Sequence, residues 1–316
     1  MLIQSIAENY GLNVKSLTLI DSHFGTEIYL LKSDGGDFIV KSLPMYADGI
    51  FAEGDVTEHL HNSGINVARL LKTADGKYAV RTDELQYHVQ DFIHGETLAV
   101  NTAPDWFMEH EADALGRIHK SLKSYGGMKI SFGADFFTRT EACGALDYYA
   151  GLLSGEEDDG TISELEERIR HLKRIADISI DAGRMTYAKS HGDYHIGQII
   201  AHDNALTVID WTSACILPSS LEIMTSYVSS DPACKDGIID SDRLKRYIDI
   251  YAKHADISAY DLEIMPFVLY FQQIMCHYTP PYSAVAAAYK PMCRLINSFT
   301  SWLYENAESL SRELVK

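Results

Sequence analysis

The secondary-structure signals of this chain change near Gly95. Residues 12–93 contain short strand-like segments separated by turns such as Asp34-Gly35-Gly36, with one helix-like stretch near residues 50–62. Apolar residues then recur at helical spacing over 106–122, 161–180, 243–254, 262–278 and the last 30 residues. Strands followed by helices favour an α+β fold. The sequence therefore predicts a small antiparallel sheet of about five strands in a lobe of residues 1–94, joined to a mainly helical lobe of residues 95–316.

The charge and the apolar content limit the partners of the chain. The 316 residues are 46% hydrophobic, enough for a large core, and carry a net charge of −18. Such a field repels nucleic acid and anionic lipid, so neither is expected as a partner. We find no stretch of ~18 apolar residues, no signal-peptide pattern at the N-terminus and no C-x-x-C pair among the five cysteines. A cytoplasmic protein is expected. The acidity also suits a cationic substrate or Mg²⁺, or simply solubility.

One stretch, SHGDYHIGQIIAHDNALTVIDW (residues 190–211), sets polar residues at the edges of apolar segments. Together with the preceding YAK (residues 187–189), we interpret it as a loop, a strand at 198–202, a turn at Asp203-Asn204 and a strand at 206–210. A hairpin of this kind brings Asp193, Gln198 and Asp210 toward one another.

Two carboxylates and an amide oxygen are the donors that Mg²⁺ takes in proteins. A carboxylate outside the metal shell can accept the proton of an attacking hydroxyl while the metal neutralises charge on phosphates. This set therefore indicates phosphoryl transfer. The alternative is that Asp193 and Asp210 are turn residues with local backbone hydrogen bonds.

HGDYHIGQ followed by VIDW resembles the H-G-D-x-x-x-x-N and I-D-[FW] motifs of the aminoglycoside phosphotransferase and choline kinase superfamily, relatives of the protein kinases. The resemblance implies a bilobal protein-kinase-like fold. It also implies that Asp193 is the catalytic base, that Asp210 is the main Mg²⁺ ligand and that His191 supports the loop. Gln198 replaces the metal-binding asparagine, which moves the amide oxygen by one methylene and leaves a non-catalytic nucleotide-binding module as an alternative.

The same resemblance implies a lysine on the third strand and a helix glutamate that orients it. Lys41 follows the apolar run of residues 38–40 and fits the lysine, although a strand lysine is usually a solvated surface group. The helix at 50–62 offers Glu53 and Glu58. Its apolar stripe passes beside Glu53 and lies opposite Glu58, so Glu53 is the expected partner.

The stretch QDFIHGETL resembles the hinge between the two lobes of the family. There the main chain of Asp91 and Ile93 would bind the adenine of ATP, or the base of GTP as the alternative. Gly25 stands where the family has a phosphate-covering loop, but one turn glycine is weak evidence. ALGRIHKSL resembles the family's L-G-x-L-H helix, in which the histidine, here His119, packs rather than reacts.

The acceptor is the least constrained part of the prediction. The resemblance implies a small molecule with a hydroxyl group, in the first place an aminoglycoside-like antibiotic and otherwise an amino alcohol or a sugar, as in choline or homoserine kinases. A metal-dependent hydrolase is a further alternative, disfavoured by Lys41 and Glu53. Aromatic residues after residue 211 could hold a cation by cation–π attraction or could belong to the core. They are Tyr227, Tyr270, His277, Tyr278 and Tyr282.

Overall fold

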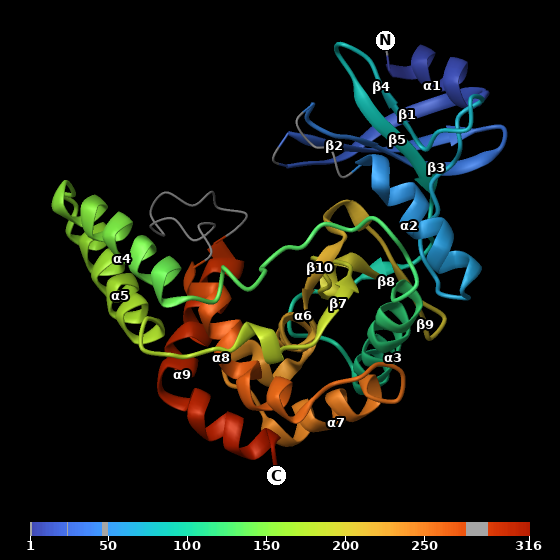
Figure 1. The fold of residues 1–316 in the computed structure, drawn as a ribbon. Helices are drawn as coiled ribbons and strands as arrows, with labels where there is room; N and C mark the ends of the chain where they lie inside the picture. Colours follow the sequence, from blue (N-terminus) through green and yellow to red (C-terminus); the bar gives the residue numbers. More distant parts are fainter. Residues whose placement is uncertain (1, 24, 46–49, 276–289) are drawn as a thin grey trace.

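The computed structural model describes residues 2–23, 25–45, 50–275 and 290–316. It has a β-rich N-terminal lobe and a larger, mainly helical C-terminal lobe, with the chain termini at opposite ends of the molecule (Figure 1). The predicted α+β architecture is confirmed. Tyr278, Tyr282 and His277 lie outside the described residues.

The N-terminal lobe is built on an antiparallel five-stranded sheet in the order β1-β2-β3-β5-β4. Its strands are β1 (Val14–His23), β2 (Thr26–Ser33), β3 (Gly36–Ser42), β4 (Ala79–Arg81) and β5 (Gln86–Asp91). The β2–β3 turn is the predicted one, and Gly36 supplies its positive φ of 122°. Helix α1 (Leu2–Tyr10), whose Ile6 is fully buried in the small core of this lobe, was not predicted from the sequence.

Helix α2 (Ile50–Asn62) lies between the lobes, close to the predicted range. Its buried Val56 and Leu60 belong to the large core of the C-terminal lobe rather than to the small core above it. The segment after α2 also contacts the C-terminal lobe, because Val67 forms a parallel bridge with Val208. The N-terminal lobe is therefore tied to the C-terminal lobe by more than the connection at the hinge.

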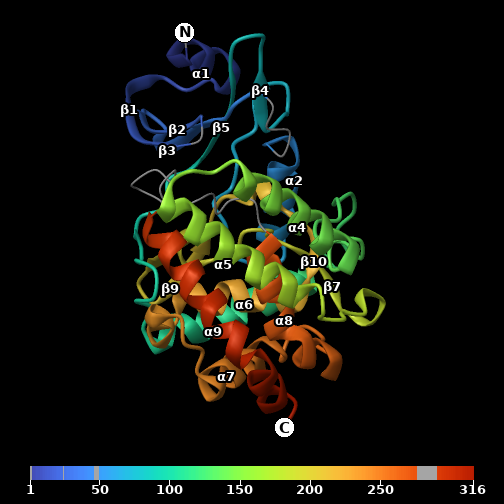
Figure 2. The ribbon, with the colours of Figure 1, turned by 90° about the vertical axis from the view of Figure 1, so that its left-hand side faces the viewer.

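The C-terminal lobe packs seven helices of the described chain around one apolar core. They are α3 (Asp105–Leu122), α4 (Arg139–Ser154), α5 (Asp159–Ile175), α6 (Ser219–Ser230), α7 (Ser241–Tyr251), α8 (Ala259–Met275) and α9 (Lys290–Leu314). Figures 1 and 2 show α4 and α5 side by side as a hairpin that projects from the body on the side away from α3. Helix α5 contacts α8 and α9, which fixes the base of this hairpin.

Two small sheets cover the C-terminal lobe below the N-terminal lobe. One contains β6 (Glu96–Thr97), β8 (Ile199–His202) and β9 (Ala205–Val208), and the other pairs β7 (Tyr187–Ser190) with β10 (Cys215–Pro218). The hairpin β8–β9 is the predicted one. The prediction of a loop at residues 187–190 was wrong, because YAKS lacks apolar alternation and becomes a strand only by pairing with β10.

Candidate active site

The hairpin β8–β9 holds the loop of residues 191–198 beside residues 209–211. Both turn residues adopt left-handed backbone, with φ of 45° at Asp203 and 58° at Asn204, the conformation of a tight two-residue hairpin. Ile209 donates its N–H to the main-chain oxygen of Gln198 at 2.9 Å, and Nε2 of His191 donates to the oxygen of Ile209 at 2.8 Å. His191 therefore braces the loop against the strand that leads to the second aspartate.

Asp193 lies at the surface of this loop with half of its side chain exposed. Nε2 of Gln198 donates to its Oδ2 at 3.3 Å, and Nε2 of His195 lies 3.6 Å from the same oxygen. Because Nδ1 of His195 accepts the N–H of Gly197 at 3.1 Å, the proton of a neutral imidazole is on Nε2 and faces Asp193. His195 was not predicted as a site residue, although its position two residues after Asp193 is a usable signal.

Asp210 faces the N-terminal lobe. Its carboxylate forms an ion pair with Lys41 of β3 and accepts the hydroxyl of Thr212 at 2.6 Å. Burial alone would raise the pKa of the Asp210 carboxyl, but the charge and hydrogen bond of Lys41, followed by the bond from Thr212, lower it to about 2. Asp210 is therefore ionised at neutral pH and joins the two lobes through a largely buried lysine.

Glu53 and Glu58 separate as the helical geometry predicts. Glu53 is 1% exposed and accepts the N–H of Trp211 at 3.0 Å, whereas Glu58 is exposed and pairs with Lys72. The resemblance implies that Glu53 orients Lys41, but in the described part of the chain Lys41 pairs with Asp210 and forms no ion pair with Glu53. The charge of Lys41 still acts on Glu53, since it limits the rise of the Glu53 pKa caused by burial.

The predicted hinge lies at the end of β5. Asp91 is held to Arg69 twice, because its N–H donates to the oxygen of Arg69 at 2.9 Å and its carboxylate pairs with Nε of Arg69 at 3.0 Å. Ile93 is half-buried, and its peptide groups make no hydrogen bond within the described ranges. The main chain of Ile93 is thus available for a ligand, while the N–H of Asp91 is already used inside the protein.

Buried polar groups fix the loop of residues 191–198 from below. Oε1 of Glu222 accepts the N–H of Gly192 at 2.7 Å, and its Oε2 lies 2.6 Å from Nε2 of His119. His119 is buried, as predicted for a packing histidine, and also bonds the hydroxyl of Tyr251. Burial alone would raise the pKa of Glu222, but the hydrogen bond and charge of His119 outweigh it and the pKa lies below its usual value.

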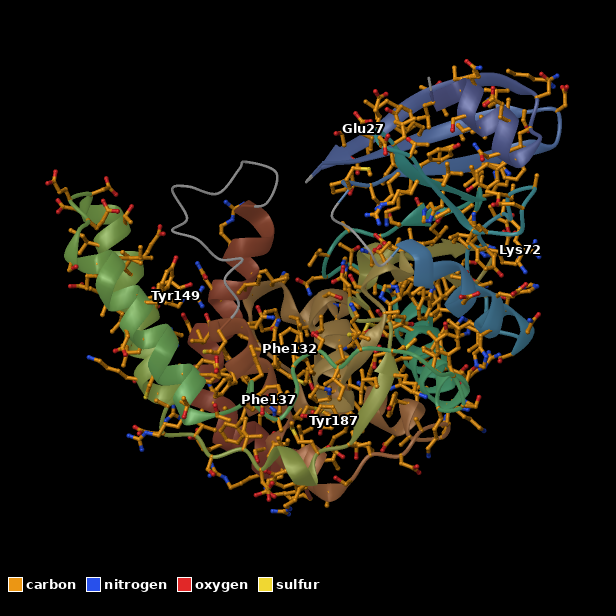
Figure 3. All side chains as sticks on the ribbon, turned by 45° about the horizontal axis from the view of Figure 1, so that its top comes forward. Glu27, Lys72, Phe132, Phe137, Tyr149 and Tyr187 are labelled. Atoms are coloured by element: carbon orange, nitrogen blue, oxygen red, sulfur yellow. The ribbon has the colours of Figure 1, made fainter. Side chains whose placement is uncertain are left out.

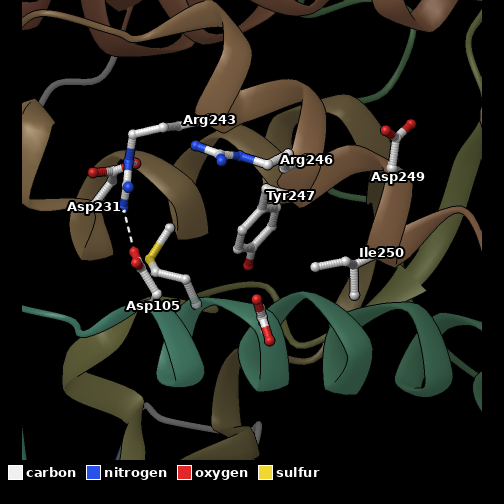
Figure 4. A pocket seen from close by; sticks show the side chains of 9 residues that line it. Asp105, Asp231, Arg243, Arg246, Tyr247, Asp249 and Ile250 are labelled. Atoms are coloured by element: carbon white, nitrogen blue, oxygen red, sulfur yellow. Dashed lines mark hydrogen bonds and ion pairs between the residues drawn. The ribbon is translucent and has the colours of Figure 1, made fainter.

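A separate cavity of about 300 Å³ lies between α3 and α7 (Figure 4). Within it Arg243 bridges Asp231, at 2.7 Å, and Asp105, at 3.1 Å. It contains none of the predicted site residues. Tyr227 and Tyr270 are also fully buried and bond the oxygen of Asp240 and the ring of His171, so both belong to the core and are not on a ligand surface.

The sequence matches the phosphotransferase enzyme family over residues 16–255. The chain belongs to this family. The predicted resemblance is thus confirmed, and with it the assignment of the chain as a small-molecule phosphotransferase enzyme. No curated protein matches the sequence significantly.

Solved structures share the fold of this phosphotransferase at low sequence identity. Spectinomycin phosphotransferase APH(9)-Ia, in complex with ADP and spectinomycin, has a TM-score of 0.69 and 14% identity, covering 99% of this chain and 98% of that chain. The amicoumacin kinase hAmiN, in complex with AMP-PNP, Ca²⁺ and Ami, has a TM-score of 0.66 and 13% identity, covering 98% and 92%. Choline kinase from Cryptosporidium parvum Iowa II has a TM-score of 0.63 and 13% identity, covering 95% and 91%.

The donors at the interlobe site suit a metal that is held only partly by protein. Among the described residues no group of three or more His, Cys, Asp and Glu side chains could hold a metal ion. Mg²⁺ is commonly bound by one or two carboxylates together with phosphate oxygens and water, which Asp210 and the amide of Gln198 fit. No helix in the described part of the phosphotransferase is long and apolar enough to span a membrane.

Proposed function

We propose that this phosphotransferase moves the γ-phosphoryl group of ATP to a hydroxyl group of a small molecule. The observation that carries the proposal is the convergence of Lys41 and Asp210 across the lobes, beside a loop in which Asp193 is flanked by Gln198. Residues 1–94 would bind the nucleotide, and residues 95–316 would carry the catalytic loop and the acceptor pocket. A cytoplasmic location is proposed with ATP as the donor, and GTP is the alternative donor.

Asp193 is the proposed general base. Its exposed carboxylate can reach an acceptor hydroxyl from solvent, and the side-chain N–H of Gln198 donates to Oδ2, with Nε2 of His195 3.6 Å from the same oxygen. That leaves Oδ1 to accept the hydroxyl proton.

Lys41 is the proposed partner of the α- and β-phosphates, with Glu53 nearby, and the main chain of Asp91 and Ile93 is proposed to bind the base. Asp210 and Gln198 are the residues that would hold Mg²⁺. When bound, the ion supplies positive charge at the phosphate oxygens.

The acceptor is proposed to be a cationic hydroxyl compound. Two proteins with this fold are described with the antibiotic spectinomycin and with Ami, and another is a choline kinase. The net charge of −18 favours a cationic acceptor, so an aminoglycoside-like antibiotic is proposed first and an amino alcohol or sugar second. The binding surface does not include Tyr227 or Tyr270, which lie in the core.

The test is a screen of purified protein with ATP and Mg²⁺ against antibiotics, amino alcohols and sugars, read by mass spectrometry for the gain of one phosphoryl group. Asp193→Ala should lower kcat with the best acceptor by roughly 10²–10⁴ and leave nucleotide affinity nearly unchanged. Asp177→Ala removes an exposed carboxylate at the end of α5 and is the control expected to match the wild type. Near-normal turnover of Asp193→Ala would show that Asp193 is not the general base.

The second candidate is a nucleotide-binding module without turnover. One contact favours this candidate: the amide nitrogen of Gln198 donates to Asp193. The amide that would bind a metal is therefore also bonded to the proposed base. A module of this kind would be stabilised against heat by ATP and would give no phosphorylated product with any acceptor.

A further inference from the structure

His88 lies next to Lys41 on the sheet of the N-terminal lobe. It is directly opposite Lys41 in the β3–β5 pairing, and directly opposite residues of antiparallel strands place their side chains on the same face. His88 is 0% exposed and Lys41 is 7% exposed. The imidazole therefore stands in the protein interior beside the lysine that faces Asp210.

Glu53 meets His88 from helix α2. Its Oε2 lies 3.3 Å from Nδ1 of His88, but the approach does not have the geometry of a hydrogen bond. Within the described residues, Oε2 of Glu53 and both ring nitrogens of His88 lack a hydrogen-bond partner. The other carboxylate oxygen of Glu53 accepts the N–H of Trp211, the residue after Asp210. Glu53 thus connects His88 with the segment that carries the proposed metal ligand.

Burial makes this arrangement costly for folding. Burial and then the charge of Lys41 lower the pKa of His88 to about 3, so the ring is neutral at physiological pH. A buried polar group with unpaired nitrogens destabilises a fold, and an apolar side chain of similar size would fill the same position without that loss. Packing therefore does not explain a histidine here, and the polar side chain that the ring approaches is Glu53.

We propose that His88 is a positioning residue for nucleotide binding, which limits where the Glu53 carboxylate can lie beside the Trp211 N–H and thereby sets the charge near Lys41 when its ammonium group binds the phosphates. It acts through Glu53 and touches neither substrate nor metal. The inference rests on the proposed function of Lys41 as a phosphate-binding residue.

The test is His88→Leu, measured by thermal unfolding, by calorimetric binding of ATP with Mg²⁺ and by turnover. We expect an unfolding temperature equal to or above that of the wild type, a Kd and a KM for ATP about tenfold higher, and a kcat within twofold. His88→Asn, which keeps an N–H near the position of Nδ1, should restore the Kd to within about threefold of the wild type. A purely structural histidine would behave in the opposite way, with lower stability and unchanged Kd.

Two controls isolate the contact. Tyr87→Phe removes a partly buried hydrogen bond to Ser5 from the neighbouring position of β5, whose side chain is on the other face of the sheet, and should leave the Kd unchanged. If His88 acts through Glu53, adding His88→Leu to Glu53→Gln should weaken ATP binding no further, and independent effects would overturn the proposal.

Different results would overturn the role of His88 and the proposed function. A wild-type Kd for His88→Leu, together with a raised Kd for Lys41→Ala, would overturn the role of His88 alone. A wild-type Kd for Lys41→Ala would overturn the phosphate-binding role of Lys41 and the inference with it.

Discussion

Asp210 holds its backbone in the left-handed region, with φ of 61° and ψ of 68°. Aspartate tolerates this conformation better than most residues, but it still costs on the order of 1 kcal/mol or more. The hydroxyl of Thr212 and the ammonium of Lys41 both bind the carboxylate that this backbone presents. A strained residue held by two such contacts is typical of a functional position.

Glu111 is a buried carboxyl in α3 that the proposed chemistry does not use. Its Oε1 accepts the hydroxyl of Ser230 at 2.8 Å, and burial raises its pKa from the usual 4.5 to about 8. The folded protein therefore binds this proton more tightly than the unfolded chain does. The resulting contribution to stability is complete below pH 4.5 and is lost as the pH rises toward 8.

We expect Glu111→Gln to weaken this pH dependence. At about 1.4 kcal/mol per pKa unit, the group accounts for a loss on the order of 4 kcal/mol in the free energy of unfolding between pH 5 and pH 8. Urea unfolding at several pH values should show a shallower decline for the variant. Glu109→Gln, at an exposed position of the same helix, should keep the wild-type slope. Equal slopes for wild type and Glu111→Gln would contradict the assignment.

Local motifs explain which site residues the sequence could identify. Asp193, Gln198 and Asp210 lie in one short stretch, where spacing and strand signals place them together. His88 is different, because a single histidine in an apolar strand is usually a core residue. Its contact with Glu53 depends on strand pairing and on the position of α2, which no local pattern contains.

At the scale of elements, Gly192 connects two segments that the chain must bring close together. It has φ of 87°, and a Cβ atom there would lie 2.0 Å from the main-chain oxygen of Ser213. Only glycine fits both conditions, so the loop that carries Asp193 and the turn after Asp210 pack backbone against backbone.

Gly192→Ala should therefore separate these segments. We expect a loss of stability of about 2 kcal/mol or more and a fall in kcat, because the proposed base moves relative to the proposed metal ligand. Thermal unfolding and turnover check both effects. Gly126→Ala is the control, since nothing lies within 4 Å of its added Cβ atom. Wild-type turnover of Gly192→Ala would mean that the loop tolerates the shift.

Elements with strong local signals were predictable, and elements defined by pairing were not. The turn at Asp203-Asn204 identifies the hairpin β8–β9, and the apolar stripe of α2 separates buried Glu53 from exposed Glu58. Strand β7 is short and depends on β10 for its existence. Helix α1 is likewise recognisable only once Ile6 is seen in the small core.

At the scale of the molecule, several bonds besides the hinge join the lobes. Lys41 pairs with Asp210, Trp211 donates to Glu53, and residues 66–68 bond Val208 through their main chain. Nucleotide binding at this junction should therefore stabilise both lobes together.

Lys41→Ala should raise the KM for ATP by about tenfold or more, because the phosphates lose their proposed cation. Lys72→Ala is the matched control: this lysine lies at the outer edge of the N-terminal lobe, half exposed, in an ion pair with Glu58 (Figure 3). Steady-state kinetics at saturating acceptor would measure both. Wild-type ATP kinetics for Lys41→Ala would place the lysine outside the nucleotide site.

The order of lobes follows from the sequence because strands and helices are segregated along it. The acceptor surface cannot be predicted in this way, because aromatic residues in helices have the same spacing whether they pack in the core or bind a ligand. Tyr227 and Tyr270 illustrate this, because their pattern allowed both readings and the structure places both in the core.

The main-chain oxygen of Gln198 bonds the hairpin, whereas the side chain of Gln198 points to Asp193. Exchanging one amide side chain for a shorter one at this position would leave the scaffold bonds in place. If Gln198 holds the ion as proposed, the metal site of such an enzyme could therefore diverge by a single codon, without any compensating mutation elsewhere in the chain.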